Sequence, residues 1–339
     1  MADSILGHGA VHPSGEFLFL TGREYGKGVN MKADGAMIGN GLKISAVKEF
    51  AGRVARANCN VLVTGETGTG KELMARLIHS LSLRAKGPLV SFNCAAIPDS
   101  LLEAELFGYE KGAFTGAWQR NEGRIGEANS GTLFLDEIGE MSLFAQAKVL
   151  RSIDSGQVQR LGTKGTTPVD IRLVAATNQN LELMVREGRF RKDLYFRLNV
   201  ARIELPPLRE RSDDVLELAD HFLRVLSATN PRPPVGFSTQ VRESFLRYSW
   251  PGNIRELKNV VEVALVHDPY PFVELKHLPQ EIWPLESRPA LKPDRERIVN
   301  ALRISNWNKS EAAKQLRWSR MTLYRKIARY SIEEEIPAH

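Results

Sequence analysis

The stretch of residues 60–72, NVLVTGETGTGKE, limits the possible folds most, because an apolar run meets a glycine-rich turn that ends in Lys71. The turn carries three glycines, Gly65, Gly68 and Gly70. Such glycines let backbone N–H groups point inward around anionic oxygens, and the lysine can reach terminal phosphates. Residues 72–80 have helical spacing, so the positive end of a helix dipole would face the same phosphates. The stretch therefore predicts a nucleotide-binding phosphate loop between a strand and a helix.

The residue after the lysine departs from the usual phosphate-loop pattern. A serine or threonine normally holds Mg²⁺ there, whereas this chain has Glu72. Thr67 and Thr69 supply nearby hydroxyls, and a carboxylate at the start of a helix suits its dipole. The loop alone therefore leaves the metal ligand open.

Two further strand ends carry polar groups suited to nucleotide hydrolysis. The apolar run 132–135 ends in Asp136 and Glu137, and the run 169–176 ends in Thr177 and Asn178. Nucleotide hydrolases need a metal-binding Asp and a water-activating base at strand ends beside the phosphate loop. Strands that alternate with helices in this way predict an α/β domain whose parallel sheet is covered on both faces.

Composition excludes several classes of protein. The 339 residues are 42% hydrophobic and 25% charged, as in globular chains of two or three domains. No apolar run is long enough to span a bilayer, and residues 1–17 lack the features of a signal peptide, so we expect a cytoplasmic protein with no membrane partner. Cys59 and Cys94 are too few for a disulfide framework or a metal cluster, and we expect buried, reduced thiols.

The C-terminal third differs from the rest in pattern and in charge. Helical periodicity dominates residues 208–284, a polar stretch with two prolines follows, and three short helices are predicted between 295 and 330. Residues 291–330 contain eleven Lys and Arg against three Asp and Glu, although the whole chain carries a net charge of only +6. A basic excess on a small helical unit is typical of nucleic-acid binders.

Together these motifs resemble the bacterial enhancer-binding activators of sigma-54 RNA polymerase, the NtrC class of AAA+ ATPases. The resemblance is carried by GAFTGA at 112–117, GETGTGKE at 65–72, GTLFLDE at 131–137 and WPGNIRELKN at 250–259. It implies an AAA+ parallel-sheet α/β P-loop ATPase domain with an α-helical lid, and a small all-α helix-turn-helix domain. The expected parts are a leader 1–36, an ATPase subdomain 37–206, a lid 207–284, a linker 285–294, a Fis-type helix-turn-helix 295–330 and an acidic tail 331–339.

The resemblance also implies ATP and Mg²⁺ as cofactors and gives roles to single residues. Lys71 would hold the β- and γ-phosphates, Asp136 the Mg²⁺, and Glu137 would polarise the attacking water. Asn93 resembles the residue that holds this glutamate back between states. The arginine fingers, which act in the neighbouring subunit and so imply a hexameric ring, match Arg191 and Arg197. The remaining residues implied to bind ATP are Gly65, Glu66, Thr67, Gly68, Thr69, Gly70, Glu72, Thr177, Asn178 and the lid arginine Arg255.

Two macromolecular partners follow from the same resemblance. The loop implied to contact the sigma-54 RNA polymerase holoenzyme consists of Gly112, Ala113, Phe114, Thr115, Gly116 and Ala117. The helix-turn-helix would bind upstream enhancer DNA, with dimerisation through this domain, and its candidate contacts are Asn308, Lys309, Ser319, Arg320, Thr322, Leu323, Arg325 and Lys326. Arg317 stands where many members carry glycine, which leaves the geometry of the turn open.

Two other functions share parts of this pattern: an AAA+ chaperone or remodelling ATPase, and a DNA-binding repressor for which ATP is only a ligand. Loop 112–117 argues against the first, and Glu137 with the two arginines argues against the second. Members of the class commonly carry an N-terminal receiver or ligand-sensing domain, and residues 1–36 are too few to fold as one. We therefore expect control by expression level or by a separate inhibitory protein, with a truncated gene or an excised fragment as the alternative.

Overall fold

The computed structural model describes residues 37–96, 98–284, 294–305, 307–316, 318–330 and 332. The chain divides into two compact units, Met1–Leu278 and Pro279–His339, which are described separately. The predicted leader, the acidic tail apart from Ile332, nearly all of the predicted linker, and Arg317 lie outside the described residues.

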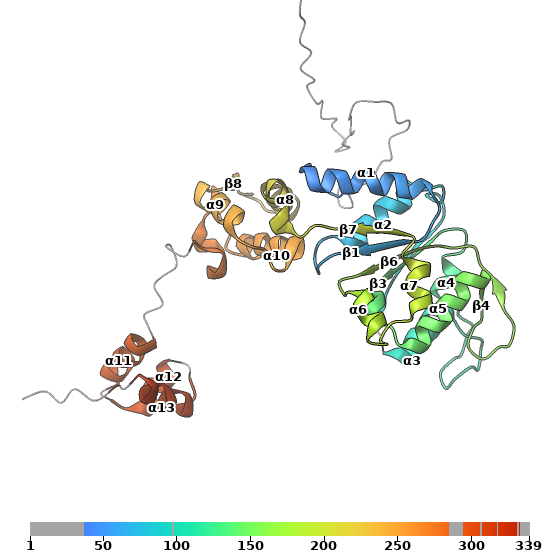
Figure 1. Cartoon of the computed structure of the whole chain (residues 1–339). Coiled ribbons are helices and arrows are strands. Elements are labelled where there is room, and N and C mark those ends of the chain that lie inside the picture. Colours follow the sequence, from blue (N-terminus) through green and yellow to red (C-terminus); the bar gives the residue numbers. More distant parts are fainter. Residues whose placement is uncertain are drawn as a thin grey trace, which may run out of the picture. The chain divides into compact units, whose positions relative to one another are not determined.

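A five-stranded parallel sheet forms the centre of the first unit (Figure 1). Its strands, in spatial order, are β2 (Leu89–Asn93), β3 (Thr132–Asp136), β6 (Arg172–Thr177), β1 (Val61–Thr64) and β7 (Ala201–Glu204). The three inner strands are almost completely buried, which explains their continuous apolar sequences. The predicted strand 169–176 is regular only from Arg172 onward.

Helices cover both faces of this sheet (Figure 1). On one face, α1 (Leu42–Arg56) and α2 (Lys71–Ser80) pack against Val61 and Val63. On the other face the core includes Leu62, and the covering helices are α3 (Asp99–Phe107), α4 (Gly123–Glu127), α5 (Leu143–Ser155), α6 (Leu181–Arg186) and α7 (Lys192–Leu198). Alternate side chains of one strand thus enter opposite cores, as the period of two in a strand requires.

The sheet register brings the predicted polar residues to one edge. Asn93 is the register partner of Asp136, and Thr64 is the register partner of Thr177. Because all five strands run in parallel, these residues end their strands on the same side, directly beside the turn that leaves β1.

The lid of the first unit contains η3 (Leu208–Glu210), α8 (Ser212–Leu226), α9 (Thr239–Arg247), α10 (Asn253–Val266) and η4 (Leu275–His277). Trp250 is fully buried in it and donates from Nε1 to the carbonyl oxygen of Phe245 at 2.9 Å. The prediction of a purely helical lid was incomplete, because β8 (Gly236–Phe237) and β9 (Phe272–Val273) form a short parallel pair. Each strand is only two residues long, too short for a periodic signal in the sequence.

The second unit is a small three-helix domain. It contains η5 (Gln280–Ile282), α11 (Asp294–Ile304), α12 (Lys309–Gln315) and α13 (Arg320–Arg329). Its core is formed by Ile298, Ala301, Leu302, Ala312, Ala313, Leu323 and Ile332. In the parts of the chain that the structure describes, no helix has both the length and the apolar character needed to cross a membrane.

Candidate functional site

The turn between β1 and α2 has the backbone geometry of a phosphate loop. Gly68 has φ +82°, and a Cβ atom there would lie 2.4 Å from the carbonyl oxygen of Gly252. Only glycine satisfies both the left-handed conformation and this close approach. The loop therefore passes directly under the first residues of the lid helix α10.

Lys71 joins the loop to the predicted catalytic carboxylate. Its side chain is only 6% exposed, and its Nζ lies 3.2 Å from Oε1 of Glu137. The same ammonium group donates to the carbonyl oxygen of Gly65 at 3.2 Å. The structure thus brings the predicted phosphate-binding cation and the predicted base together in one small site.

Glu137 is fixed from two sides. Its Oε2 accepts a hydrogen bond from the backbone N–H of Asn178 at 3.1 Å, while Lys71 holds Oε1. Its backbone lies in the left-handed region, at φ 51° and ψ 50°, which is uncommon for a residue other than glycine. The side-chain Nδ2 of Asn178 donates to Oγ1 of Thr67 at 2.9 Å, so the residue that follows β6 connects the glutamate to the phosphate loop.

Asp136 is the carboxylate beside the phosphate loop that could bind a metal. Its Oδ1 accepts the backbone N–H of Glu137 at 3.1 Å, and burial, followed by the neighbouring Glu137 carboxylate, raises the pKa of Asp136. The described residues contain no group of three or more His, Cys, Asp and Glu side chains that could hold a metal alone. Mg²⁺ is normally held by one or two carboxylates together with phosphate oxygens and water, so one partly buried Asp beside a phosphate loop fits Mg²⁺–ATP.

Two other predicted residues have local partners at this edge. The Asn93 side chain, which was predicted to hold Glu137 back between states, accepts the backbone N–H of Ala95 at 2.9 Å. In this structure Glu137 is held by Lys71 and Asn178. Thr177 is fully buried, and its Oγ1 accepts the backbone N–H of Gln179 at 3.0 Å.

A link between the phosphate loop and the lid was not predicted from the sequence. Glu66 forms two hydrogen bonds with Arg209 of η3, at 2.8 and 2.6 Å, and a third with the Asn253 amide at 3.1 Å. These hydrogen bonds lower the pKa of the Glu66 carboxyl group to about 2, and the bond with Arg209 has the largest effect. Asn253 is fully buried, donates to the Thr67 carbonyl oxygen at 3.0 Å, and accepts the backbone N–H of Leu208 at 2.7 Å.

Asn253 and its neighbour Arg255 belong to α10, whose start rests on the loop. The backbone N–H of Ile254 donates to the Gly68 carbonyl oxygen at 3.0 Å, and a Cβ atom on Gly68 would lie 3.1 Å from Cβ of Arg255. The predicted lid arginine is therefore beside the phosphate loop. The sequence signal that could have revealed Asn253 is the Pro-Gly-Asn turn at 251–253, where asparagine tolerates the observed φ of 53°.

Arg191, the N-cap residue of α7, and Arg197 in the last turn of α7 are both exposed. Arg191 pairs with Asp193 at 2.7 Å, and Arg197 pairs with Asp154 of α5 at 2.9 Å. The Arg197 carbonyl oxygen accepts from Asn60, which precedes β1 and so lies at the edge of the sheet opposite the phosphate loop. The structure thus leaves both arginines outside the cluster around Lys71 of the same chain.

Loop 112–117 protrudes between α3 and α4 as a closed turn. The backbone N–H of Gly112 donates to the Ala117 carbonyl oxygen at 2.9 Å, and that of Ala117 donates to the Phe114 carbonyl oxygen at 3.0 Å. Phe114 is 42% exposed and packs edge-on against Tyr109 with ring centroids 4.9 Å apart. Thr115 and both glycines are exposed, whereas Ala117 is buried and supports the loop from within.

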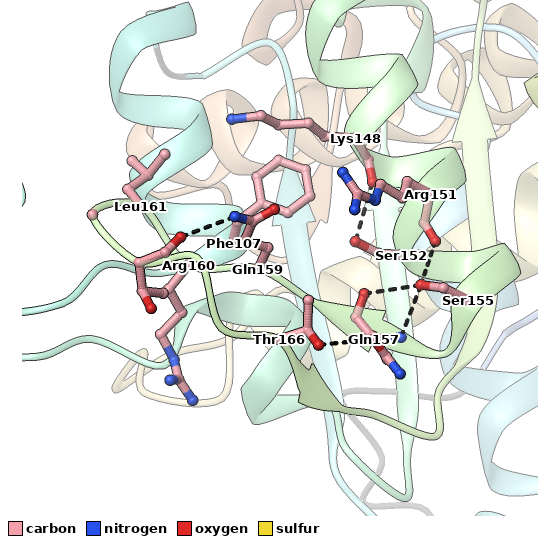
Figure 2. A pocket seen from close by; sticks show the side chains of 12 residues that line it. Phe107, Lys148, Arg151, Ser152, Ser155, Gln157, Gln159, Arg160, Leu161 and Thr166 are labelled. Carbon is pink, nitrogen blue, oxygen red and sulfur yellow. Dashed lines mark hydrogen bonds between the residues drawn. The ribbon is translucent and has the colours of Figure 1, made fainter.

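A second loop, residues 159–166 between β4 (Gln157–Val158) and β5 (Thr167–Pro168), supports the base of loop 112–117. The backbone N–H of Leu161 donates to the Gly108 carbonyl oxygen at 2.9 Å, and the Leu161 carbonyl oxygen accepts the backbone N–H of Glu110 at 3.0 Å. Arg160 pairs with Glu110 at 2.9 Å. Figure 2 shows the pocket that the second loop shares with Phe107 and α5, with Lys148, Arg151 and Arg160 among its lining residues. The sequence pattern did not reveal the second loop.

The second unit places the candidate DNA contacts in different environments. Arg320 and Arg325 are exposed on α13, and Ser319 caps this helix by accepting the backbone N–H of Thr322 at 3.1 Å. Leu323 is fully buried in the core, so its predicted DNA contact is wrong for this arrangement of helices. The other candidates have local roles: Asn308 caps α12, Lys309 lies over the Tyr324 ring at 5.4 Å, and Lys326 lies over the Trp318 ring at 4.6 Å.

Comparison with known families divides the chain into three parts. Residues 37–204 match the Sigma-54 interaction domain, residues 209–293 match the AAA+ ATPase lid domain, and residues 293–330 match the Fis family of bacterial regulatory proteins. These matches agree with the fold class and with the three kinds of site described above.

Several known proteins resemble the chain along most of its length. The transcriptional regulatory protein ZraR of Salmonella typhimurium is 46% identical over 301 residues, which span 86% of this chain and 68% of that protein. The regulatory protein AtoC of Escherichia coli K12 is 45% identical over 297 residues, 83% of this chain and 64% of that protein. The chain thus spans about two thirds of the length of these relatives.

A solved structure shows the same arrangement of elements. The crystal structure of NtrX from Brucella abortus in complex with ATP has a TM-score of 0.69 and 33% sequence identity, and the match covers 87% of this chain and 69% of that chain. The chain therefore belongs to the family of sigma-54-dependent transcriptional regulators, which combine an AAA+ ATPase domain with a Fis-type helix-turn-helix.

Proposed function

We propose that this protein is a DNA-binding transcription activator that hydrolyses ATP as a ring oligomer and uses the energy to remodel sigma-54 RNA polymerase closed complexes into open complexes. The observation that carries the proposal is the position of Glu137, held between Lys71 and Asn178 beside the phosphate loop. This arrangement lies in the same domain as the exposed loop 112–117. A hydrolysis site and a partner-binding loop within one domain support coupling between the two.

The chemistry assigned to the site is electrostatic catalysis of phosphoryl transfer. Lys71 would hold the β- and γ-phosphates, and Glu137 would orient and polarise the attacking water. Asp136 would bind Mg²⁺, which, when present, neutralises the charge that develops on the phosphate oxygens. The main-chain N–H groups of the phosphate loop and the dipole of α2 would hold the remaining oxygens.

The hydrogen bonds around Glu137 support a way for ATP to change the conformation of the domain. A γ-phosphate would compete with Glu137 for Lys71, because both are anions that the same ammonium group attracts. Glu137 is also bonded to Asn178, and Asn178 to Thr67 of the phosphate loop. Thr177 and Asn178 would thus sense the γ-phosphate, and Asn93 would receive Glu137 in another state of the cycle.

Arg191 and Arg197 would complete the site of a neighbouring subunit, which implies a hexameric ring. Both lie on the surface in ion pairs that are about half exposed, and such pairs cost little to break. Release from Asp193 and Asp154 would free both guanidinium groups for the phosphates across the subunit interface. The Arg197 backbone lies at the edge of the sheet opposite the phosphate loop, and Arg191 pairs with Asp193, and both observations support action in trans.

The two remaining surfaces would bind the macromolecular partners. Loop 112–117 would contact sigma-54 through Phe114 and Thr115, and α13 would enter upstream enhancer DNA with Arg320, Thr322 and Arg325 directed at phosphates or bases. A dimer through the helix-turn-helix domain would match a two-fold symmetric DNA site.

The test is to measure ATPase activity and sigma-54-dependent open-complex formation with the purified protein. We expect both activities in the same preparation. An AAA+ chaperone would hydrolyse ATP without forming open complexes, and a repressor with ATP as a ligand would show neither activity.

A Thr115→Ala variant should separate hydrolysis from partner binding. Thr115 is exposed and has no part in the contacts around Lys71, so we expect normal ATP turnover with loss of sigma-54 binding and of open complexes. The measurements are kcat for ATP and the Kd of sigma-54 on the same samples. A loss of ATPase activity as large as the loss of transcription would contradict the role assigned to the loop.

A further inference from the structure

Trp118, the first residue after loop 112–117, is 82% exposed. It is about twice as exposed as Phe114, at 42%, although a tryptophan has the larger apolar surface. Single exposed apolar residues are common, but a nearly free indole next to a partner-binding loop is unusual, because tryptophans are enriched where partners bind.

The backbone holds Trp118 in this exposed position. Its N–H donates to the Gly116 carbonyl oxygen at 2.9 Å, which closes a three-residue turn. Gly116 has φ +104°, and a Cβ atom added to it would meet no other atom within 4 Å, so the glycine serves the conformation of the chain and not a close contact. Between them, Ala117 is buried and anchors the turn to the domain.

Phe114 is less available for a partner than its motif suggests. Its ring already packs edge-on against Tyr109, with the centroids 4.9 Å apart. Burial of Phe114 on a partner would therefore replace an existing contact, whereas burial of Trp118 would remove mostly water. Trp118 offers the largest gain in buried apolar area at this tip, and its backbone is already ordered by the turn.

Exposed polar and charged residues follow Trp118 in the chain. Gln119 and Arg120 follow it and are exposed, and Arg120 lies 3.5 Å from Glu122 in a surface ion pair. An aromatic side chain with a polar rim is the usual arrangement of a binding hot spot.

We propose that Trp118, next to loop 112–117, anchors this protein to sigma-54, with its indole inserted in an apolar pocket on the sigma-54 surface. The inference rests on the proposed function, because the partner is taken from the adjoining loop 112–117. It adds to that function a residue outside the loop that contributes to the strength of binding together with Phe114 and Thr115.

The experiment compares Trp118→Ala with Leu83→Ala as a matched control. Leu83 is 83% exposed and lies between α2 and β2, outside the loop. The binding of sigma-54 is measured in the presence of ATP and of ADP with aluminium fluoride, which mimics the transferring phosphate. We expect Trp118→Ala to bind about 30-fold more weakly, the effect of a hot spot of about 2 kcal/mol, with unchanged ATPase activity and Tm. Leu83→Ala should bind like the unmodified protein.

The Trp118→Phe variant adds an independent measurement. We expect it to keep most of the affinity, since an aromatic ring is retained, and to remove a blue shift of tryptophan fluorescence that accompanies sigma-54 binding in the unmodified protein. Affinity and fluorescence that are the same in all variants would overturn the proposal. Loss of binding only when promoter DNA is present would also overturn it, because Trp118 would then stack on DNA.

The Thr115→Ala variant separates this inference from the proposed function. If Thr115→Ala abolishes sigma-54 binding and Trp118→Ala does not weaken it, the anchor is refuted while the activator function stands. If neither variant affects binding, the proposed function of the loop fails as well.

Discussion

Glu137 has a backbone conformation that costs about 1–2 kcal/mol for a residue with a Cβ atom. The conformation places its carboxylate within reach of both Lys71 and the Asn178 N–H group. Local strain at a residue with such specific contacts is typical of functional sites. At this position the chemistry of the side chain outweighs the preference of the backbone.

A Glu137→Gln substitution should abolish turnover and retain nucleotide binding. Glutamine keeps an oxygen for the Asn178 N–H group but cannot act as a base, and a positioned base contributes about 10²–10⁴ in rate. The measurements are kcat and the Kd of ATP, with Glu140→Gln as the control, because Glu140 is an exposed carboxylate three residues further along. Normal turnover by Glu137→Gln would show that another group activates the water.

At the scale of the element, the sequence predicts those helices, strands and loops that a short local pattern marks. The phosphate loop, the strand end at Asp136 and the helix α2 follow from spacing within about ten residues, and the structure has all three. The link of Glu66 to Arg209 and Asn253 joins residues 143 and 187 positions apart, so no local pattern contains it. The second loop escaped prediction for a related reason, since its role depends on contacts with Gly108 and Glu110 about fifty residues earlier.

The buried position of Leu323 shows a second limit of prediction from the sequence, which concerns the face of a helix. The helix α13 was predicted correctly, but Leu323 was included among its DNA contacts because the helix-turn-helix resemblance marks the helix and not the face. The core of this unit has only a few large side chains, so each turn of α13 must contribute one of them.

An Asn253→Ala substitution should loosen the lid from the phosphate loop. It leaves the Leu208 N–H group without its acceptor in a buried site, at a cost of about 1–3 kcal/mol, and it removes the donor to Thr67. We expect a lower free energy of unfolding and weaker ATP binding, measured by denaturant titration and by calorimetry. Asn259→Ala is the matched control, since Asn259 is an exposed asparagine on the same helix. Equal effects of the two substitutions would exclude a special role for Asn253.

An Arg325→Ala substitution should weaken DNA binding through the loss of one phosphate contact. The slope of log K against log salt concentration should become shallower by about one unit. Fluorescence anisotropy at several salt concentrations measures this slope. Lys314→Ala on α12 is the control, because Lys314 is exposed but lies outside the helix that we expect to enter the groove. The same change in slope for both variants would place the DNA across both helices.

At the scale of the whole molecule, we propose that a neighbouring subunit completes the ATPase site of each chain. One unit holds Lys71, Asp136 and Glu137 at the phosphate edge, whereas its arginines on α7 are held in surface ion pairs. A head-to-tail ring joins one such site to the arginine surface of the next subunit at every interface. ATPase activity should therefore rise cooperatively with protein concentration.

Mixing two inactive variants tests this arrangement directly. Arg191→Ala keeps an intact phosphate loop, and Lys71→Ala keeps an intact finger, so each alone should be inactive. In equimolar mixed rings about a quarter of the interfaces combine the two intact halves, and ATPase activity should recover to a corresponding part of the original value. The control mixes Lys71→Ala with a Lys71→Ala, Arg191→Ala double variant, which contains no intact phosphate loop.

ATPase activity that recovers in the first mixture and is absent in the control can arise only if Arg191 acts on a nucleotide held by another subunit. Removal of Arg191 should cost little stability, because its partner Asp193 is exposed and remains solvated, so a loss of activity cannot be attributed to unfolding. Co-assembly is checked by pull-down of one tagged variant with the other. Mixed rings that form but stay inactive at every ratio would place the finger function on another residue, and Arg197 would then be the next arginine to test by the same design.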